Sequence, residues 1–176
     1  MEHRSLGTSG LKISSLCLGA MTFGESKTFM KGVTSSDDEA KRVFDRAIER
    51  GVNLIDTANV YSEGQSEELT GKWIKDKRQK VLLATKCRFP IGFGQTEKPG
   101  PHDSGLSRQH IMGACEASLK RLGTDHIDLY QVHMQDTTVR IEETMRALDD
   151  LITQGKVRYI GCSNYTGYRL TESLWV

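Results

Sequence analysis

Four side chains that can give up or accept a proton stand at the ends of consecutive predicted strands in this sequence. They are Asp56, Tyr61, Lys86 and His133, which end or follow the strands predicted at residues 53–56, 81–86 and 127–133. Parallel strands place their carboxyl ends at the same end of a sheet, where α/β folds bind ligands, so we expect the four groups to meet at one mouth. A carboxylate, a phenol, an amine and an imidazole together are suited to general acid–base catalysis.

The elements that position these residues repeat one pattern of strand, loop and amphipathic helix. Strands are predicted to begin near residues 16, 53, 81, 127 and 157, the first of them buried, and glycines follow the helices at 51, 123 and 155. Ser36 with Glu39 forms a capping box, and Ser107 caps a later helix. Such βα units join by right-handed crossovers into a parallel sheet. A small β-hairpin turning at residues 8–10 precedes the first unit.

Side-chain alternation along each strand adds a prediction about which residues face the mouth. The expected inward pairs are Leu54 with Asp56, Ala84 with Lys86, and Gln131 with His133. Two long loops should border the same mouth: residues 21–34, and an insertion over residues 87–106 that contains Pro90, Pro99 and Pro101. Loops of this length are often functional.

Composition limits the class of protein. The chain has 176 residues, 37% of them hydrophobic and 27% charged, with a net charge of +1, which predicts one globular domain over residues 1–176. Without a block of like charge, neither nucleic acid nor a membrane is an expected partner. The polar amino terminus lacks the apolar run of a signal peptide, so we expect a cytoplasmic protein. The scattered cysteines predict reduced packing residues and no metal site.

Each candidate residue also has a simpler structural explanation. Taken alone, Asp56 and Tyr61 would be a helix cap and a half-buried aromatic, Lys86 a solvated loop residue and His133 a core histidine. Their occurrence together, in register with successive strand ends, favours the functional interpretation. The remaining histidines and the tryptophans carry no such signal: His3, His102, His110 and His126 are expected at the surface, and Trp73 and Trp175 in packing.

The motifs around these residues resemble those of the aldo-keto reductase superfamily over essentially the whole chain. The matching segments are Asp-Thr-Ala-x-x-Tyr at 56–61, Ala-Thr-Lys at 84–86, Asp-Leu-Tyr-Gln-Val-His at 128–133 and Gly-Cys-Ser-Asn at 161–164. The segment Met-Thr-Phe-Gly at 21–24 is closer to bacterial reductases related to potassium-channel β-subunits. The resemblance implies an α/β fold of the (β/α)8 TIM-barrel type.

The resemblance also implies an oxidoreductase that reduces a small aldehyde or ketone with hydride from NADPH. Tyr61 would be the general acid, and Lys86, oriented by Asp56, the cation that eases release of its proton. His133 would donate a hydrogen bond to the substrate oxygen. The cofactor-binding residues implied are Gly19, Ala20, Met21, Asp56, Ser163 and Asn164, with Ala20 standing where many relatives have Thr. No Gly-x-Gly-x-x-Gly or P-loop motif supports another nucleotide fold.

The length of the chain leads to a further expectation. A (β/α)8 barrel typically needs ~250 residues, whereas this sequence holds about five predicted strands and ends within a helical pattern. We therefore expect an amino-terminal portion of a longer reductase, completed by a carboxyl-terminal segment, by another polypeptide or by self-association. The alternative is a catalytically idle regulatory or cofactor-binding protein.

Overall fold

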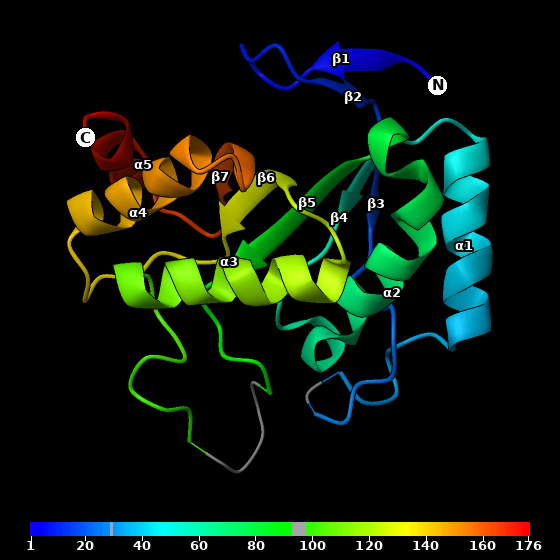
Figure 1. Ribbon diagram of the computed structural model, residues 1–176, viewed down its shortest axis with the longest axis horizontal. Helices are drawn as coiled ribbons and strands as arrows, with labels where there is room; N and C mark the ends of the chain where they lie inside the picture. The colour runs from blue at the N-terminus through cyan, green and yellow to red at the C-terminus, as the bar shows by residue number, and fades with distance from the viewer. Residues whose placement is uncertain (29, 93–97) are drawn as a thin grey trace.

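A five-stranded parallel sheet forms the centre of the molecule, in a computed structural model that describes residues 1–28, 30–92 and 98–176 (Figure 1). The strands lie in the order of the sequence. They are β3 (Cys17–Gly19), β4 (Leu54–Asp56), β5 (Leu82–Cys87), β6 (Ile127–Val132) and β7 (Val157–Cys162). Sequential parallel neighbours require a crossover after every strand, so the predicted βα pattern is confirmed.

The crossovers are helices that cover one face of this sheet (Figure 1). They are α1 (Asp37–Glu49), α2 (Gln65–Ile74), α3 (Arg108–Leu122) and α4 (Ile141–Thr153), while α5 (Gly167–Leu174) follows β7. Two short 3-10 helices, η1 (Tyr61–Gly64) and η2 (Lys75–Lys80), flank α2. The predicted capping box of Ser36 and Glu39 begins α1, and the Ser107 side chain accepts from the His110 amide at the start of α3. These caps satisfy helix-end amides that would otherwise lack partners.

The predicted hairpin is present as the antiparallel pair β1 (His3–Ser5) and β2 (Lys12–Ser14). It lies at the end of the sheet opposite to the long loops (Figure 1). Asn53, just before β4, holds it there: its Oδ1 accepts from the Ser14 amide at 2.7 Å and its Nδ2 donates to the Lys12 carbonyl at 3.1 Å. The hairpin therefore leaves the carboxyl end of the sheet free.

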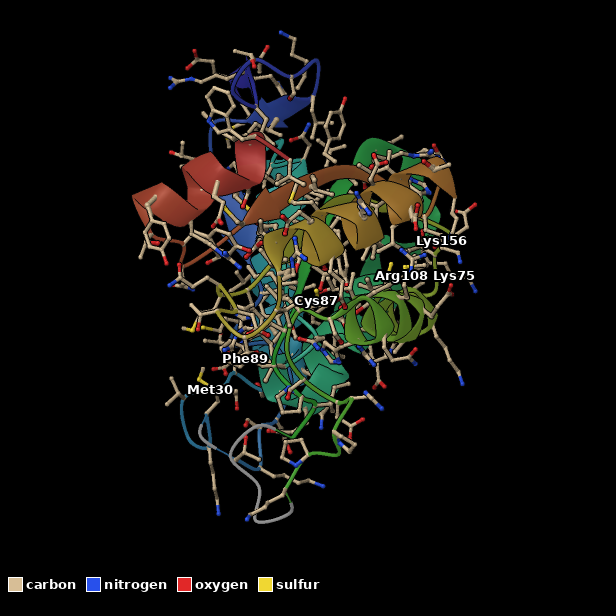
Figure 2. All side chains as sticks on the ribbon, turned by 90° about the vertical axis from the view of Figure 1, so that its left-hand side faces the viewer. Met30, Lys75, Cys87, Phe89, Arg108 and Lys156 are labelled. Atoms are coloured by element: carbon tan, nitrogen blue, oxygen red, sulfur yellow. The ribbon has the colours of Figure 1, made fainter. Side chains whose placement is uncertain are left out.

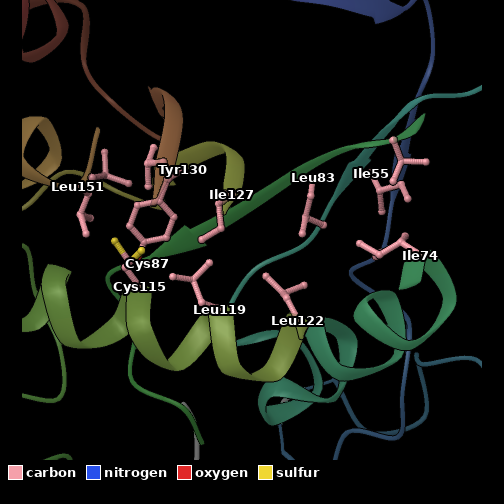
Figure 3. Packing of buried hydrophobic residues seen from close by; sticks show 14 of the residues in the cluster. Ile55, Ile74, Leu83, Cys87, Cys115, Leu119, Leu122, Ile127, Tyr130 and Leu151 are labelled. Atoms are coloured by element: carbon pink, nitrogen blue, oxygen red, sulfur yellow. The ribbon is translucent and has the colours of Figure 1, made fainter. Parts of the chain in front are cut away.

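The hydrophobic core fills the space between the sheet and its helices (Figure 3). Leu83 and Tyr130 project from the strands towards Leu122 and Leu119 of α3, and Ile55 lies beside Ile74 of α2. Burial of each such side chain contributes roughly 1.5–3 kcal/mol. Because alternate strand residues face the helices, the others, including the predicted inward residues, must face the opposite side of the sheet.

Two predictions about burial are wrong. The first strand is not buried: Leu16 is 62% exposed and Cys17 is also exposed, because β3 is an edge strand with one neighbour. Trp175 is 86% exposed and does not pack, whereas Trp73 lies in the core as predicted. All four cysteines are free thiols, and Cys87 and Cys115 are buried.

The predicted insertion over residues 87–106 begins one residue later than expected, because Cys87 is the last residue of β5. Its described residues form no helix or strand, and residues 93–97 lie outside the described part. Asp136 fixes its end, since the carboxylate accepts from the Leu106 amide at 2.9 Å. The loop at residues 21–34 is likewise irregular where it is described. A β-bridge joins Phe23, near its start, to Ser35, just after its end.

The close contact between α2 and α3 yields a prediction about stability. A Cβ added at Gly71 would lie 2.3 Å from the Leu122 carbonyl oxygen, whereas one added at Gly113 of α3 meets nothing within 4 Å. We expect Gly71→Ala to lower the free energy of unfolding by about 1–3 kcal/mol, because the backbones must separate. Gly113→Ala, the matched control, should raise it by up to about 1 kcal/mol. Urea denaturation followed by circular dichroism measures both, and equal effects would contradict the close contact.

Candidate active site

The structure brings the four predicted groups together at the carboxyl ends of neighbouring strands. Asp56 is the last residue of β4, Lys86 the penultimate residue of β5, and His133 directly follows β6. Tyr61 begins η1, after the chain has left β4. The register places Asp56 beside Gly19 of β3 and Ala84 of β5. Strand order and register thus position three of the four groups.

Lys86 is the centre of this group. Its side chain is only 7% exposed, and its Nζ donates to Asp56 Oδ2 at 2.5 Å, to the Thr57 carbonyl at 2.8 Å and to the Tyr61 hydroxyl at 3.4 Å. An ammonium has three N–H donors, and each has an acceptor here. A buried charge is tolerated when it is paired and hydrogen-bonded in this way.

Gln131 is a further member of the site. The sequence predicted that its side chain faces the mouth but gave it no function. Its Nε2 donates to Asp56 Oδ1 at 2.9 Å, so each oxygen of this carboxylate has a different partner. Gly161 of β7 makes room for it, since a Cβ there would lie 3.3 Å from Gln131 Cγ. Strand alternation, which paired Gln131 with His133, was the available signal, but the contact joins β6 to β4, two strands away in the sheet.

An unusual backbone follows Tyr61. The next residues, Ser62 and Glu63, have φ values of 47° and 56°, a left-handed conformation rare for residues other than Gly. The Glu63 carboxylate holds this turn by accepting from Ser26 Oγ at 2.9 Å and from the Lys27 amide at 3.1 Å. Although desolvation acts in the opposite direction, the hydrogen bond from the Thr28 hydroxyl, together with these two, lowers the pKa of Glu63. The loop after β3 and the turn after β4 therefore hold each other in place.

His133 packs between two aromatic rings. The Tyr61 ring is 5.6 Å away and the Phe89 ring 5.1 Å away, centroid to centroid, both in edge contact. Burial lowers the pKa of His133 to about 4, and the nearby Lys86 ammonium lowers it further than Asp56 raises it. The imidazole is therefore neutral near pH 7, and a neutral imidazole keeps one N–H to donate. Its Nδ1 is buried and has no hydrogen-bond partner among the described residues.

Only some of the predicted cofactor-binding residues lie beside the four groups. Gly19 lies beside Asp56 with nothing within 4 Å of an added Cβ, and Asn164 Nδ2 donates to the His133 carbonyl at 2.8 Å and to Ser163 Oγ at 3.0 Å. These residues border the four groups. Ala20 is different, because its side chain is buried in the core and its amide donates to the Asp56 carbonyl. Met21 is 45% exposed.

Comparison with known proteins identifies the family. The model of the Aldo/keto reductase family matches residues 15–175. The chain belongs to the aldo/keto reductase family. The solved structure of the aldo-keto reductase AKR11C1 from Bacillus halodurans, in its holo form, superposes with a TM-score of 0.85 at 35% identity, covering 99% of this chain and 54% of that one.

Two curated relatives of this aldo/keto reductase chain show the range of the family. The uncharacterized oxidoreductase YrpG of Bacillus subtilis is 41% identical over 98% of the chain and 52% of its own length. A protein named probable voltage-gated potassium channel subunit beta, from Arabidopsis thaliana, is 38% identical over 98% of the chain and 49% of its own length. The chain thus spans about half the length of the curated relatives it matches.

The family assignment confirms the predicted barrel-type fold, of which the described residues supply five βα units. Among these residues, no helix is long and apolar enough to cross a membrane. Within the same described ranges, no three His, Cys, Asp or Glu side chains are grouped to hold a metal ion.

The environment of His133 predicts its titration. We expect its imidazole to stay neutral on acidification until about pH 4, as measured by NMR titration of its Cε1 proton. Lys86→Met should raise this pKa by removing the nearby positive charge, whereas Lys80→Met, at an exposed lysine, should not change it. An unchanged pKa in both variants would show that Lys86 does not act on His133.

Proposed function

We propose that the protein to which this chain belongs reduces aldehydes or ketones to alcohols with hydride from NADPH. The observation that supports this best is the hydrogen bonding of Lys86 Nζ to both Asp56 Oδ2 and the Tyr61 hydroxyl. Negative charge develops on a carbonyl oxygen as hydride reaches its carbon, and a nearby acid must neutralise that charge. The phenol, held beside an ammonium, is placed to supply the proton.

Each residue of the group then has a separate task. Tyr61 donates its proton to the substrate oxygen, and the adjacent Lys86 ammonium stabilises the phenolate that remains. Asp56 keeps the ammonium oriented, with Gln131 on its second oxygen. His133, neutral because of its lowered pKa, donates a hydrogen bond to the same substrate oxygen and so sets its position. General acid catalysis of this kind typically contributes 10²–10⁴-fold.

The residues bordering the group fit the nicotinamide end of the cofactor. When bound, NADPH supplies the hydride that reduces the carbonyl carbon. The side chains of Ser163 and Asn164 would hydrogen-bond the carboxamide, while Gly19 leaves open space at the edge of the sheet. Ala20 could contribute only its backbone, because its side chain lies in the core, and Met21 would contribute apolar contact. The cofactor that we propose is NADPH, not NADH.

A second candidate function is a regulatory or cofactor-binding role without turnover. It is favoured by the 38% identity to the Arabidopsis protein named as a potassium channel subunit beta, and by the half-length match to the relatives. In either function, a carboxyl-terminal segment, another polypeptide or a second copy would complete the barrel. Nucleic acid and membranes are not proposed partners.

Substitution of the phenol separates the two functions. We expect the protein to oxidise NADPH in the presence of a reactive aromatic aldehyde. Tyr61→Phe should lower kcat/KM by about 10²–10⁴-fold, because the proton donor is lost. Tyr168→Phe, at an exposed tyrosine of α5, is the matched control and should keep the full rate. Equal rates for Tyr61→Phe and the unaltered protein would contradict the role of Tyr61. NADPH binding, measured by fluorescence quenching, with no turnover in any variant would favour the regulatory function.

A further inference from the structure

Gln131 reaches the ion pair of Asp56 and Lys86 from the far side of the lysine. In the register of the sheet Gln131 of β6 is the partner of Lys86 of β5, whereas Asp56 ends β4. The hydrogen bond from Gln131 Nε2 to Asp56 Oδ1, at 2.9 Å, therefore spans β5. Cys87, the residue after Lys86, marks this level of the sheet in Figure 2, between the hairpin at one end of the molecule and the long loops at the other.

The residues around Gln131 on this face are a cation, a neutral ring and a glycine. Its partners in register are Lys86 and Gly161, and His133 follows on the same face of its own strand. Burial lowers the pKa of His133 to about 4, so this ring is neutral near pH 7. A Cβ added at Gly161 would lie only 3.3 Å from Gln131 Cγ, so the absence of a side chain there lets the glutamine keep its position.

A neutral donor suits the second oxygen of the Asp56 carboxylate. Oδ2 already pairs with Lys86 at 2.5 Å, and the two charges balance each other. A second cation at residue 131 would leave the site with a net positive charge, and an apolar side chain would leave Oδ1 without its donor. The amide supplies an N–H and adds no charge. Gln131 therefore satisfies the carboxylate and keeps the pair neutral.

The position of the Asp56 carboxylate decides whether the ammonium reaches Tyr61. The side chain of Asp56 is 29% exposed, against 7% for Lys86, so the carboxylate is the less enclosed member of the pair. The hydrogen bond from Lys86 Nζ to the Tyr61 hydroxyl is the longest of three, at 3.4 Å against 2.5 and 2.8 Å. At about 3.6 Å such a contact is no longer a hydrogen bond, so a shift of a few tenths of an ångström would end it.

We infer that Gln131 is a positioning residue for the proton donor. It fixes the Asp56 carboxylate, so that the Lys86 ammonium stays within hydrogen-bonding reach of the Tyr61 hydroxyl. Gln131 acts through two other side chains and not on the substrate itself. The inference rests on the proposed function for the role of Tyr61, whereas the effect of Gln131 on Lys86 does not depend on turnover.

The effect on Lys86 is measured by ¹⁵N NMR of its ammonium group, whose protons exchange slowly with water while they are buried and hydrogen-bonded. Gln131→Leu removes the donor and keeps a side chain of similar size. We expect it to speed this exchange by about tenfold, as for loss of a hydrogen bond to a charged group. Gln79→Leu, at an exposed glutamine of η2, is the matched control and should leave the exchange unchanged.

The backbone amides of β5 are the internal reference for this measurement. They should exchange at their usual rate in Gln131→Leu, because the change is confined to the side chains at the mouth. Unchanged exchange of the Lys86 protons would overturn the inference. Faster exchange throughout β5 would equally overturn it, because the effect would then be a general loss of stability.

The aldehyde assay tests the consequence for Tyr61. Gln131→Leu should lower kcat by about tenfold and change KM by less than about twofold, because the lost interaction acts on the proton donor and not on substrate binding. A raised KM with normal kcat would contradict a positioning role. Absence of turnover in every variant, with faster exchange of the Lys86 protons in Gln131→Leu, would refute the proposed function and support the hold of Gln131 on the pair.

Gln131→Glu gives a readout that a merely structural role would not produce. The new carboxyl can donate to Asp56 Oδ1 only while it is protonated, and once it ionises two carboxylates face each other. The kcat of this variant relative to the unaltered protein should fall at least about tenfold as the pH rises from about 5 to about 8. The ratio for Gln131→Leu should stay constant, as should that for the control Gln79→Glu. His133 does not titrate in this range, since its pKa is about 4. A ratio for Gln131→Glu that does not change with pH would count against the inference.

Discussion

The buried ammonium of Lys86 imposes the constraint on which the candidate site depends. A charge at 7% exposure is stable only if all its donors are matched, and the acceptors come from different parts of the chain: the end of β4, the residue after it, and η1. The strand order must therefore place β4 beside β5, and the chain after β4 must turn back. The Tyr61 amide closes that turn by donating to the Ala58 carbonyl at 3.2 Å.

The residue before Lys86 anchors β5 on its other face. Thr85 points towards the helices, where its hydroxyl donates to Glu67 of α2 at 2.6 Å, and Glu67 is paired with Arg121 of α3. A buried carboxylate that lost either partner would be strongly destabilising. Adjacent residues of one strand thus belong to two charged networks on opposite sides of the sheet.

The segment between β4 and η1 connects the mouth with the insertion that follows β5. The Asn59 amide donates to the Lys86 carbonyl at 3.1 Å, while its side chain donates to the carbonyl of Phe89, whose ring packs on His133. The same few residues therefore join the mouth to the insertion that follows β5. The curated relatives that the chain matches are about twice as long as this chain.

Local sequence determined the secondary structure, because caps, glycines and apolar periodicity act over a few residues: the capping box at Ser36 and the strand at residues 157–162 are both found where the sequence predicts them. It also brought Asp56, Tyr61, Lys86 and His133 to one end of the sheet, since parallel strands share a direction. Burial was decided by tertiary structure. Cys17 is exposed because β3 lies at an edge of the sheet, and His110, which the sequence predicted at the surface, is buried because the insertion covers α3. The link from Gln131 to Asp56 and the low pKa of His133 likewise arise from residues distant in sequence, whose distances only the packed chain sets.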